Sequence, residues 1–154
     1  MAVDKIPQGY HSLTPYLTVK DGNRAMKFYK EALGAKEIVR MPGPGGGIMH
    51  ADMLIGDSHI MMSEEFPERG AVSPKTLGGV SGSLVLYLDN VDEAFAKAVA
   101  AGGKVIQPVQ DQFYGDRSGT FEDPEGHKWT IGTHVEDVSP EEMKRRMADM
   151  FKPA

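Results

Sequence analysis

The chain has 154 residues, of which 25% are charged and 40% hydrophobic, and its formal net charge is −5 at pH 7. These values are typical of one globular domain over residues 1–154, and the acidic balance argues against nucleic acid or an anionic membrane surface as a partner. The absence of cysteine excludes disulfides, thiolate metal sites and cysteine nucleophiles.

The first half of the chain predicts a strand, a helix and three further strands. Residues 13–19 alternate between apolar and polar side chains, which predicts a strand with one buried face. Asp21 and Asn23 can cap a helix whose apolar residues recur at helical spacing as far as Gly34, a typical stop. The three strands that follow are predicted at residues 36–41, 48–55 and 59–63.

In the second of these three strands, residues 48–55, alternation places Met49, Ala51 and Met53 on one face and His50 and Asp52 on the other. The glycine-rich residues 42–47 before it predict a flexible lid or a plain hairpin tip. They lack the lysine and hydroxyl residue of a phosphate-binding loop, which argues against nucleotide binding.

The same order of elements recurs after a linker predicted at residues 64–81. A shift of 69 positions places Thr14 on Ser83, and a shift of 68 later places Met62 on Thr130. The repeat predicts an α+β fold with two tandem βαβββ modules, at residues 10–63 and 82–134.

A last helix is predicted at residues 139–152, where Ser139 can cap, Pro140 suits the first helical position and Glu142 completes a capping box. We expect this helix to dock on the domain or on a partner subunit through an apolar stripe made of Met143, Met147, Met150 and Phe151.

No apolar run approaches the roughly 18 residues that a membrane span requires. The first residues also lack the apolar stretch of a secretory signal. We therefore expect a cytoplasmic protein.

Two phrases, at residues 21–29 and 122–128, resemble the vicinal oxygen chelate superfamily, which includes glyoxalase I, extradiol dioxygenases and bleomycin-resistance proteins. The resemblance covers nearly all of residues 10–134, and residues 114–121 look most like the PhnB-like branch. It implies that the two modules form a curved, cup-shaped mixed sheet with helices on the outer face, and that two chains form a homodimer.

In metal-dependent members of that superfamily, four side chains that point into the cup hold a divalent cation. The resemblance places these ligands at Thr14, Ser83, Thr130 and Met62, or at Ser63 in place of Met62 if the loop shifts register. Hydroxyl and thioether groups are poor ligands for such metals, which prefer imidazole and carboxylate. We therefore expect no standard metal site and no cofactor, and a rearranged site that uses His50 and Glu122 is the alternative.

Following the same alternation, we expect a mainly polar cup. Acid–base chemistry there would fall to His50, Asp52 or Glu122. Arg117 would hold an anionic group of a ligand or pair with Asp116. The predicted lining residues are Thr14, Tyr16, Thr18, His50, Asp52, Met62, Ser83, Val85, Tyr87, Glu122, Lys128 and Thr130.

The other four histidines are assigned no role in ligand binding. His59 and His127 lie at equivalent turns and are expected to be structural, whereas His11 and His134 lie at the ends of elements and are expected to be solvated.

Three functions remain open from the sequence. The chain could bind and sequester a small molecule without a metal, in the manner of bleomycin-resistance proteins, and its acidic charge would suit a cationic ligand. It could be a lyase, isomerase or dioxygenase-like enzyme with a non-standard metal or acid–base site. In the third interpretation the cup is vestigial and the chief property of the chain is assembly.

Overall fold

The computed structural model of the protein describes residues 3–152. The first module comprises β1 (Tyr16–Val19), α1 (Gly22–Leu33), β2 (Lys36–Pro42), β3 (Ile48–Ile55) and β4 (Ser58–Glu64). The second comprises β5 (Ser83–Tyr87), α3 (Val91–Ala100), β6 (Lys104–Asp111), β7 (Asp116–Glu122) and β8 (Lys128–His134). Two 3₁₀ turns (Pro44–Gly46 and Pro67–Arg69), the short helix α2 (Pro74–Leu77) and the C-terminal helix α4 (Pro140–Met150) complete the chain. The predicted α+β fold with two βαβββ modules is confirmed.

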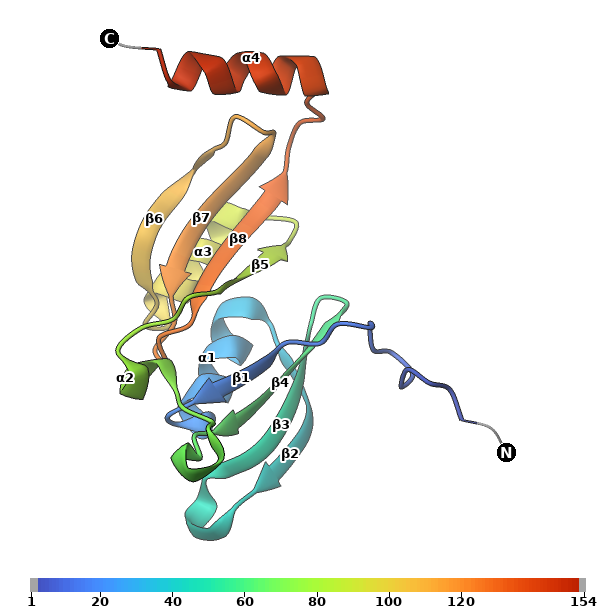
Figure 1. Ribbon diagram of the computed structural model, residues 1–154, viewed down its shortest axis with the longest axis vertical. Coiled ribbons are helices and arrows are strands. Elements are labelled where there is room, and N and C mark those ends of the chain that lie inside the picture. The colour runs from blue at the N-terminus through green and yellow to red at the C-terminus, as the bar shows by residue number, and fades with distance from the viewer. Residues whose placement is uncertain (1–2, 153–154) are drawn as a thin grey trace.

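Each module forms its own mixed four-stranded sheet. The strand orders are β1-β4-β3-β2 and β5-β8-β7-β6, and the two orders match element by element. In each sheet the first strand runs parallel to the last strand of its module, and the other pairs are antiparallel. The sheets lie one above the other in Figure 1, with β1 and β5 in the middle of the molecule.

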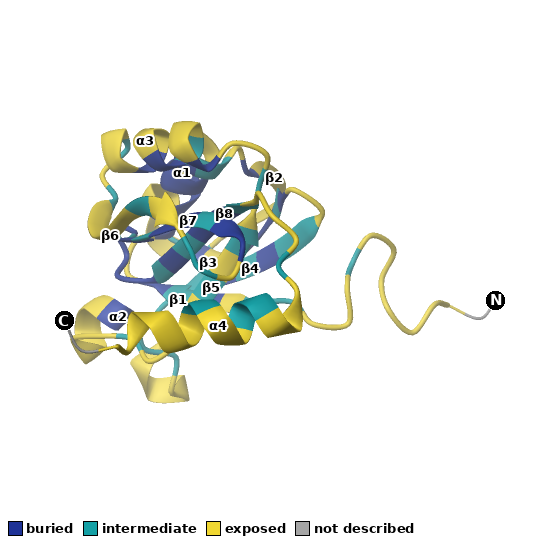
Figure 2. Cartoon of the chain, turned by 90° about the horizontal axis from the view of Figure 1, so that it is seen from above, coloured by how far each residue is buried: buried dark blue, intermediate teal, exposed yellow. Residues whose placement is uncertain are grey.

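Helices α1 and α3 lie side by side on one side of the two sheets (Figure 2). The apolar faces of the strands and of these helices form the core between them. Phe121 of β7 joins the two modules, because its ring lies 5.9 Å from that of Phe28 on α1 and 6.0 Å from that of Phe95 on α3. The opposite face of the sheets, which we call the open face, carries no such helical layer within residues 3–152.

The turn between β7 and β8 fastens the second module to the first. The buried carboxylate of Asp123 accepts hydrogen bonds from Tyr29 of α1 (2.6 Å) and from the indole of Trp129 (2.9 Å). The buried carboxylate of Glu125 accepts from the guanidinium of Arg24 (2.6 Å) and from the backbone N–H groups of residues 20 and 21. Burial, followed by the charge of Asp123, raises the pKa of Tyr29 well above its usual value, so its hydroxyl remains a donor.

Two local predictions in the first module are wrong. Strand β1 begins at Tyr16, and Leu13 is 85% exposed, because the chain joins the sheet only where β1 pairs with β4. In β3, Ile48 is buried and Met49 is 63% exposed, the reverse of the predicted alternation. The register between β2 and β3 shifts next to this point, and Ile48 turns toward Gly22 at the start of α1.

The predicted linker is more ordered than the sequence suggested. The carboxylate of Glu65 accepts hydrogen bonds from the hydroxyls of Ser73 (2.7 Å) and Thr76 (2.7 Å) and pairs with Lys20. These bonds hold α2 beside the end of β1.

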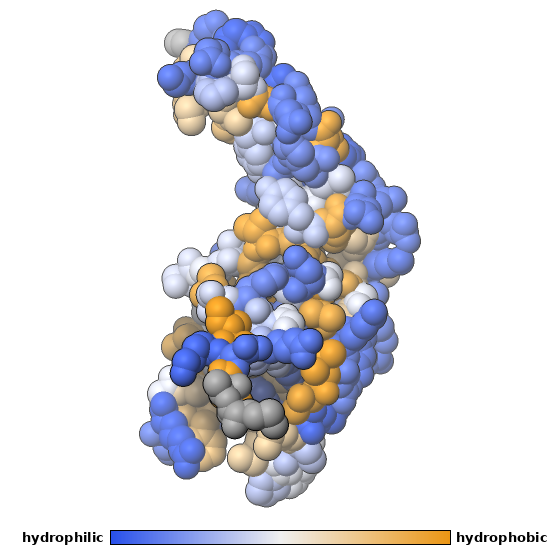
Figure 3. Space-filling model, turned by 90° about the vertical axis from the view of Figure 1, so that its right-hand side faces the viewer, coloured by the Kyte–Doolittle hydropathy of each residue, from blue (hydrophilic) through white to orange (hydrophobic). Residues whose placement is uncertain are grey.

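Helix α4 extends from one end of the molecule (Figure 3) and has no buried residue. Arg146 attaches it, through Glu136 (2.7 Å) and the backbone carbonyl of Phe113 (3.2 Å). Met150 is 62% exposed and Phe151 is 80% exposed. The apolar stripe is therefore not docked on the domain. No helix in residues 3–152 has the length and apolar character needed to cross a membrane.

Candidate functional site

The open face of the first sheet is built by alternation along three neighbouring strands. Tyr16 of β1 pairs with Met61 of β4, which in turn pairs with Asp52 of β3, so these three side chains share one face. Thr18 and His50 lie on the same face, because they are two residues away from Tyr16 and Asp52 along their respective strands. The hydroxyl of Tyr16 lies 3.2 Å from Nδ1 of His50.

The open face of the second sheet carries hydroxyls at its centre. Val85 of β5 pairs with Thr130 of β8, which pairs with Thr120 of β7, and the two threonine hydroxyls lie 2.8 Å apart. The same alternation brings four more of the predicted lining residues to this face, namely Ser83, Tyr87, Glu122 and Lys128.

Met62 lies on the opposite side of its sheet. It is fully buried in the core, where it pairs with Leu17 and Ala51. The prediction that Met62 faces the cup is wrong because the two hairpins differ in length: Ile55 pairs with Ser58 across two residues, whereas Glu122 pairs with Lys128 across five. The position equivalent to Thr130 is therefore Met61.

Thr14 precedes β1 and is half-buried. Together with Met61, Tyr10 and residues of the N-terminal segment it lines a cavity of about 350 Å³. After the correction to Met61, the superfamily resemblance implies metal ligands at Thr14 and Met61 in the first module. These two residues therefore border one cavity.

Asp52 is the most buried charged group of the open face, with 1% of its surface exposed. One carboxylate oxygen accepts a hydrogen bond from the hydroxyl of Tyr10, and the other lies 2.8 Å from Nδ1 of His59. The hydrogen bond to Asp52 raises the pKa of Tyr10, which keeps its hydroxyl protonated. Both oxygens of Asp52 are therefore engaged. Tyr10 went unnoticed in the sequence because it lies in an irregular segment six residues before β1.

A second cluster of the same residue types lies at the end of the other sheet. Asp116 accepts a hydrogen bond from Tyr87 (2.6 Å) and lies 2.7 Å from Nδ1 of His134, whose Nε2 is 2.9 Å from Asp137. Burial raises the pKa of Asp116, but these hydrogen bonds outweigh it and lower the pKa. The hydrogen bond to Asp137, followed by that to Asp116, raises the pKa of His134 above 6.5.

We expect NMR titration to find the midpoint of His134 above 6.5, and Asp137→Asn to lower it. Because the folded-state pKa is raised, the stabilisation from His134 is complete below the unfolded pKa and is lost as the pH rises through the folded value. A midpoint that stays unchanged in Asp137→Asn would show that the carboxylate does not bind the imidazolium.

Arg117 lies on the helix-covered side of the second sheet. Its Cα partner, Thr133, accepts a hydrogen bond from the first N–H of α3, which fixes that side. The guanidinium pairs with Asp92 (2.8 Å) and Asp111 (3.0 Å). The predictions that Arg117 holds a ligand in the cup or pairs with Asp116 are therefore wrong: its two charge partners come from α3 and β6.

The remaining histidines are placed as follows. His127 lies 2.9 Å from the backbone carbonyl of Thr18 and so connects the two modules. His59 is bonded to Asp52, and His11 is exposed.

The four positions at which the resemblance implies metal ligands carry unsuitable donors. Hydroxyls at Thr14, Ser83 and Thr130 with a thioether at Met61 do not suit a divalent transition metal. Within residues 3–152 no three histidine, aspartate or glutamate side chains cluster in a way that could hold one.

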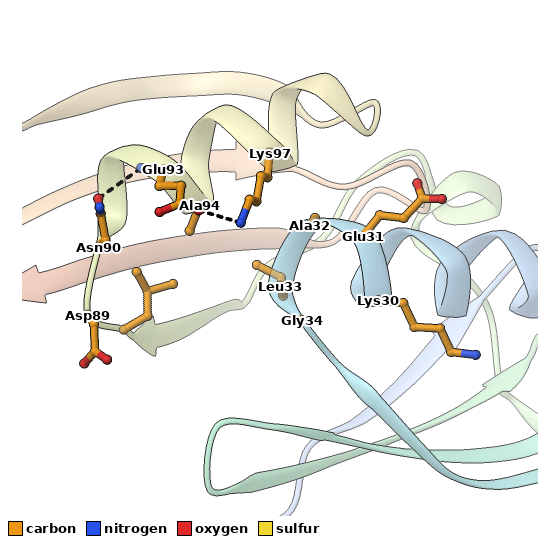
Figure 4. A pocket seen from close by; sticks show the side chains of 11 residues that line it. Lys30, Glu31, Ala32, Leu33, Gly34, Asp89, Asn90, Glu93, Ala94 and Lys97 are labelled. Atoms are coloured by element: carbon orange, nitrogen blue, oxygen red, sulfur yellow. Dashed lines mark hydrogen bonds and ion pairs between the residues drawn. The ribbon is translucent and has the colours of Figure 1, made fainter.

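Other cavities lie beside and behind the open face. One of about 560 Å³ is bordered by Tyr16, Thr18, Leu77 and His127, at the junction of the two modules. Another, of about 400 Å³, lies between the end of α1 and the start of α3 (Figure 4). In that cavity Asn90 already caps α3 through the N–H of Glu93, and Glu93 pairs with Lys97 at 2.6 Å. The open face, with its several hydroxyls and its exposed aromatic rings at Tyr16 and Tyr87, is the better candidate site.

Comparison with known proteins places the chain among proteins of one superfamily. A family model described as Glyoxalase/Bleomycin resistance protein/Dioxygenase superfamily matches residues 9–131. An uncharacterised protein of Mycobacterium bovis, Mb0911c, is 35% identical over 140 residues, which is 89% of this chain and 92% of that protein.

Solved structures share the fold. TioX from Micromonospora sp. ML1 is 28% identical, with a TM-score of 0.64 over 81% of this chain and 99% of its own. Protein PA1353 from Pseudomonas aeruginosa is 25% identical, with a TM-score of 0.64 over 82% and 99%. A mutant fosfomycin resistance protein, FosX, from Listeria monocytogenes is 22% identical, with a TM-score of 0.61 over 88% and 95%.

Proposed function

The chain belongs to the glyoxalase/bleomycin resistance protein/dioxygenase superfamily, and we propose that it binds a small organic molecule on the open face of its sheets without a divalent metal. The observation that carries this proposal is the chemistry of four positions, Thr14, Met61, Ser83 and Thr130. They offer hydroxyls and a thioether to a ligand and no imidazole or carboxylate to a metal.

The comparison with FosX sharpens the proposal. That protein was crystallised with Mn(II) and 1S,2S-dihydroxypropylphosphonic acid, so one protein of this fold takes a metal and an anionic ligand. The donor set of this chain differs, and its open face combines tyrosine rings with the acidic side chains of Asp52, Asp116 and Glu122 and with the lysines Lys36, Lys104 and Lys128. We infer that a small polar ligand with an aromatic or cationic part fits this face.

A thermal-shift panel tests the proposal. Small aromatic amines, phenols, keto-aldehydes and phosphonates are added to protein in excess EDTA, and any molecule that binds the folded state raises the melting temperature. We expect hits among the aromatic amines and the phenols, and we expect the shift caused by the aromatic amines to be lost in the double variant Tyr16→Ala, Tyr87→Ala. A panel that stabilises only after Mn(II) or Zn(II) is added would contradict the proposal.

A second candidate function is acid–base catalysis by His50. This imidazole is half-buried on the open face, and Tyr16 is its hydrogen-bond partner. Asp52 is less suited to the task, because both of its oxygens are engaged. His50→Gln would leave ligand binding in place and abolish turnover of a bound carbonyl compound. Turnover that persists in His50→Gln would exclude this role.

We further propose that the protein is a cytoplasmic homodimer. We also propose that it belongs to the PhnB-like branch, as the sequence of residues 114–121 suggests. Exposed apolar side chains support assembly, since a contiguous exposed apolar surface marks interaction sites. They are found on α4, at Met147 and Met150.

We expect sedimentation to give a dimer mass for the wild type and a monomer mass for Met147→Glu combined with Met150→Glu, because charge on the stripe opposes its burial. Lys144→Glu, on an exposed position of the same helix, is the matched control and should remain dimeric. A wild-type monomer at high concentration would overturn the proposed dimer.

A further inference from the structure

The N-terminal segment, residues 3–13, is attached to the domain through one side chain. Tyr10 is half-buried, whereas residues 3–9 and 11–13 are all exposed. The one backbone hydrogen bond of the segment, from the N–H of Tyr10 to the carbonyl of Pro7, is internal to it. Figure 1 shows this segment leaving the body past the tip of the hairpin between β3 and β4. Tyr10 is therefore the anchor of an otherwise exposed arm.

The site that receives Tyr10 belongs to the first sheet. The ring of Tyr10 is stacked on the imidazole of His59, with centroids 3.8 Å apart and an interplanar angle of 17°. Its hydroxyl donates to the carboxylate of Asp52, which is bonded on its other oxygen by Nδ1 of His59. A carboxylate this buried requires such donors, since burial without them is costly. The site thus favours a ligand that has a flat ring, which stacks on His59, and a hydrogen-bond donor at the far end of that ring, which reaches Asp52.

Neighbouring groups leave room for a larger occupant. Leu54 pairs with His59 and Met61 pairs with Asp52, which gives the site two apolar neighbours on the same face. The cavity of about 350 Å³ that Tyr10 and Met61 border continues from it toward Thr14. A substituent on the ring could extend into this space.

We propose that Asp52 and His59 form a binding site for phenols, and that Tyr10 occupies it as an internal ligand of the same chemical class. This proposal rests on the proposed function, because it names the ligand class for part of the open face. Tyr10 competes at an effective concentration in the millimolar range, set by its short tether. A free phenol must displace it, so the apparent affinity of the wild type equals the intrinsic affinity multiplied by the fraction of time that the site is empty.

The test uses full-length Tyr10→Ala and 4-methylphenol, which reproduces the tyrosine side chain. We expect 4-methylphenol to bind Tyr10→Ala about tenfold more tightly than the wild type in an NMR titration, with the largest shifts at His59 and Leu54. Toluene, which lacks the hydroxyl, should bind both proteins weakly. Asp52→Asn in the Tyr10→Ala background should remove the preference for 4-methylphenol over toluene.

Equal affinity of 4-methylphenol for wild type and Tyr10→Ala would overturn the proposal, as would equal binding of toluene. If Tyr10→Ala does not fold, Tyr10→Phe replaces it: the ring remains and the donor is lost, so 4-methylphenol should displace it more readily than it displaces Tyr10. Ligands that shift Tyr16 and Val85 while 4-methylphenol leaves His59 unmoved would refute this inference and leave the proposed function standing. Binding of 4-methylphenol at His59 only in the presence of Mn(II) would leave the phenol site standing and refute the metal-free binding of the proposed function.

Discussion

Asp123→Ala will lower the free energy of unfolding by about 4 kcal/mol, because it leaves several buried donors without an acceptor. The carboxylate of Asp123 accepts hydrogen bonds from the side chains of Tyr29 and Trp129 and from the N–H groups of Glu125 and His127. Urea unfolding followed by circular dichroism measures the loss.

Two variants serve as controls for this experiment. Asp123→Asn retains one acceptor oxygen but presents an amide N–H₂ to a donor, so its loss should fall between wild type and alanine. Asp57→Ala removes an exposed carboxylate from the hairpin turn of the first module, where Ser58 is its partner, and should leave the midpoint near that of the wild type. Equal midpoints for Asp123→Ala and Asp57→Ala would show that the turn between β7 and β8 does not fasten the modules.

Phe121→Ala should cost about 3–5 kcal/mol, the range observed when a fully buried phenylalanine is removed. Phe121 is completely buried and contacts the aromatic rings of Phe28 and Phe95, one from each module. The cavity left behind would lie between α1, α3 and β7. The two modules should therefore unfold less cooperatively with each other. Differential scanning calorimetry would record a lower melting temperature and a broader transition.

Phe66→Ala is the matched control, since Phe66 is half exposed and lies outside the core. We expect it to change the melting temperature far less than Phe121→Ala does. Similar effects of the two substitutions would contradict the role of Phe121 at the junction of the modules.

The sequence predicted the fold well because its repeat has a physical basis. Apolar alternation in the strands and helical spacing in α1 and α3 follow from which faces are buried, and the predicted caps at Asp21 and Ser139 occur where their helices begin. The expected alternation also brought Tyr16, His50, Asp52 and Thr130 to the open face.

The errors arise where a local pattern depends on distant structure. Met62 was misplaced because the two hairpin turns differ by three residues, which changes the register of one strand while the residue types hardly change. Arg117 was misplaced because its partners, Asp92 and Asp111, come from elements that the sequence alone cannot bring together. Tyr10 carries no periodic signal, so its contact with Asp52 became visible only in three dimensions.

The central claim is that the open face binds a small molecule without a divalent metal. The most direct test is a calorimetric titration of the strongest thermal-shift hit, carried out once in excess EDTA and once with added Mn(II). Because Thr14, Met61, Ser83 and Thr130 supply no good metal ligand, the account predicts the same dissociation constant in both buffers. Binding that appears only with Mn(II), and is lost again on chelation, would contradict it.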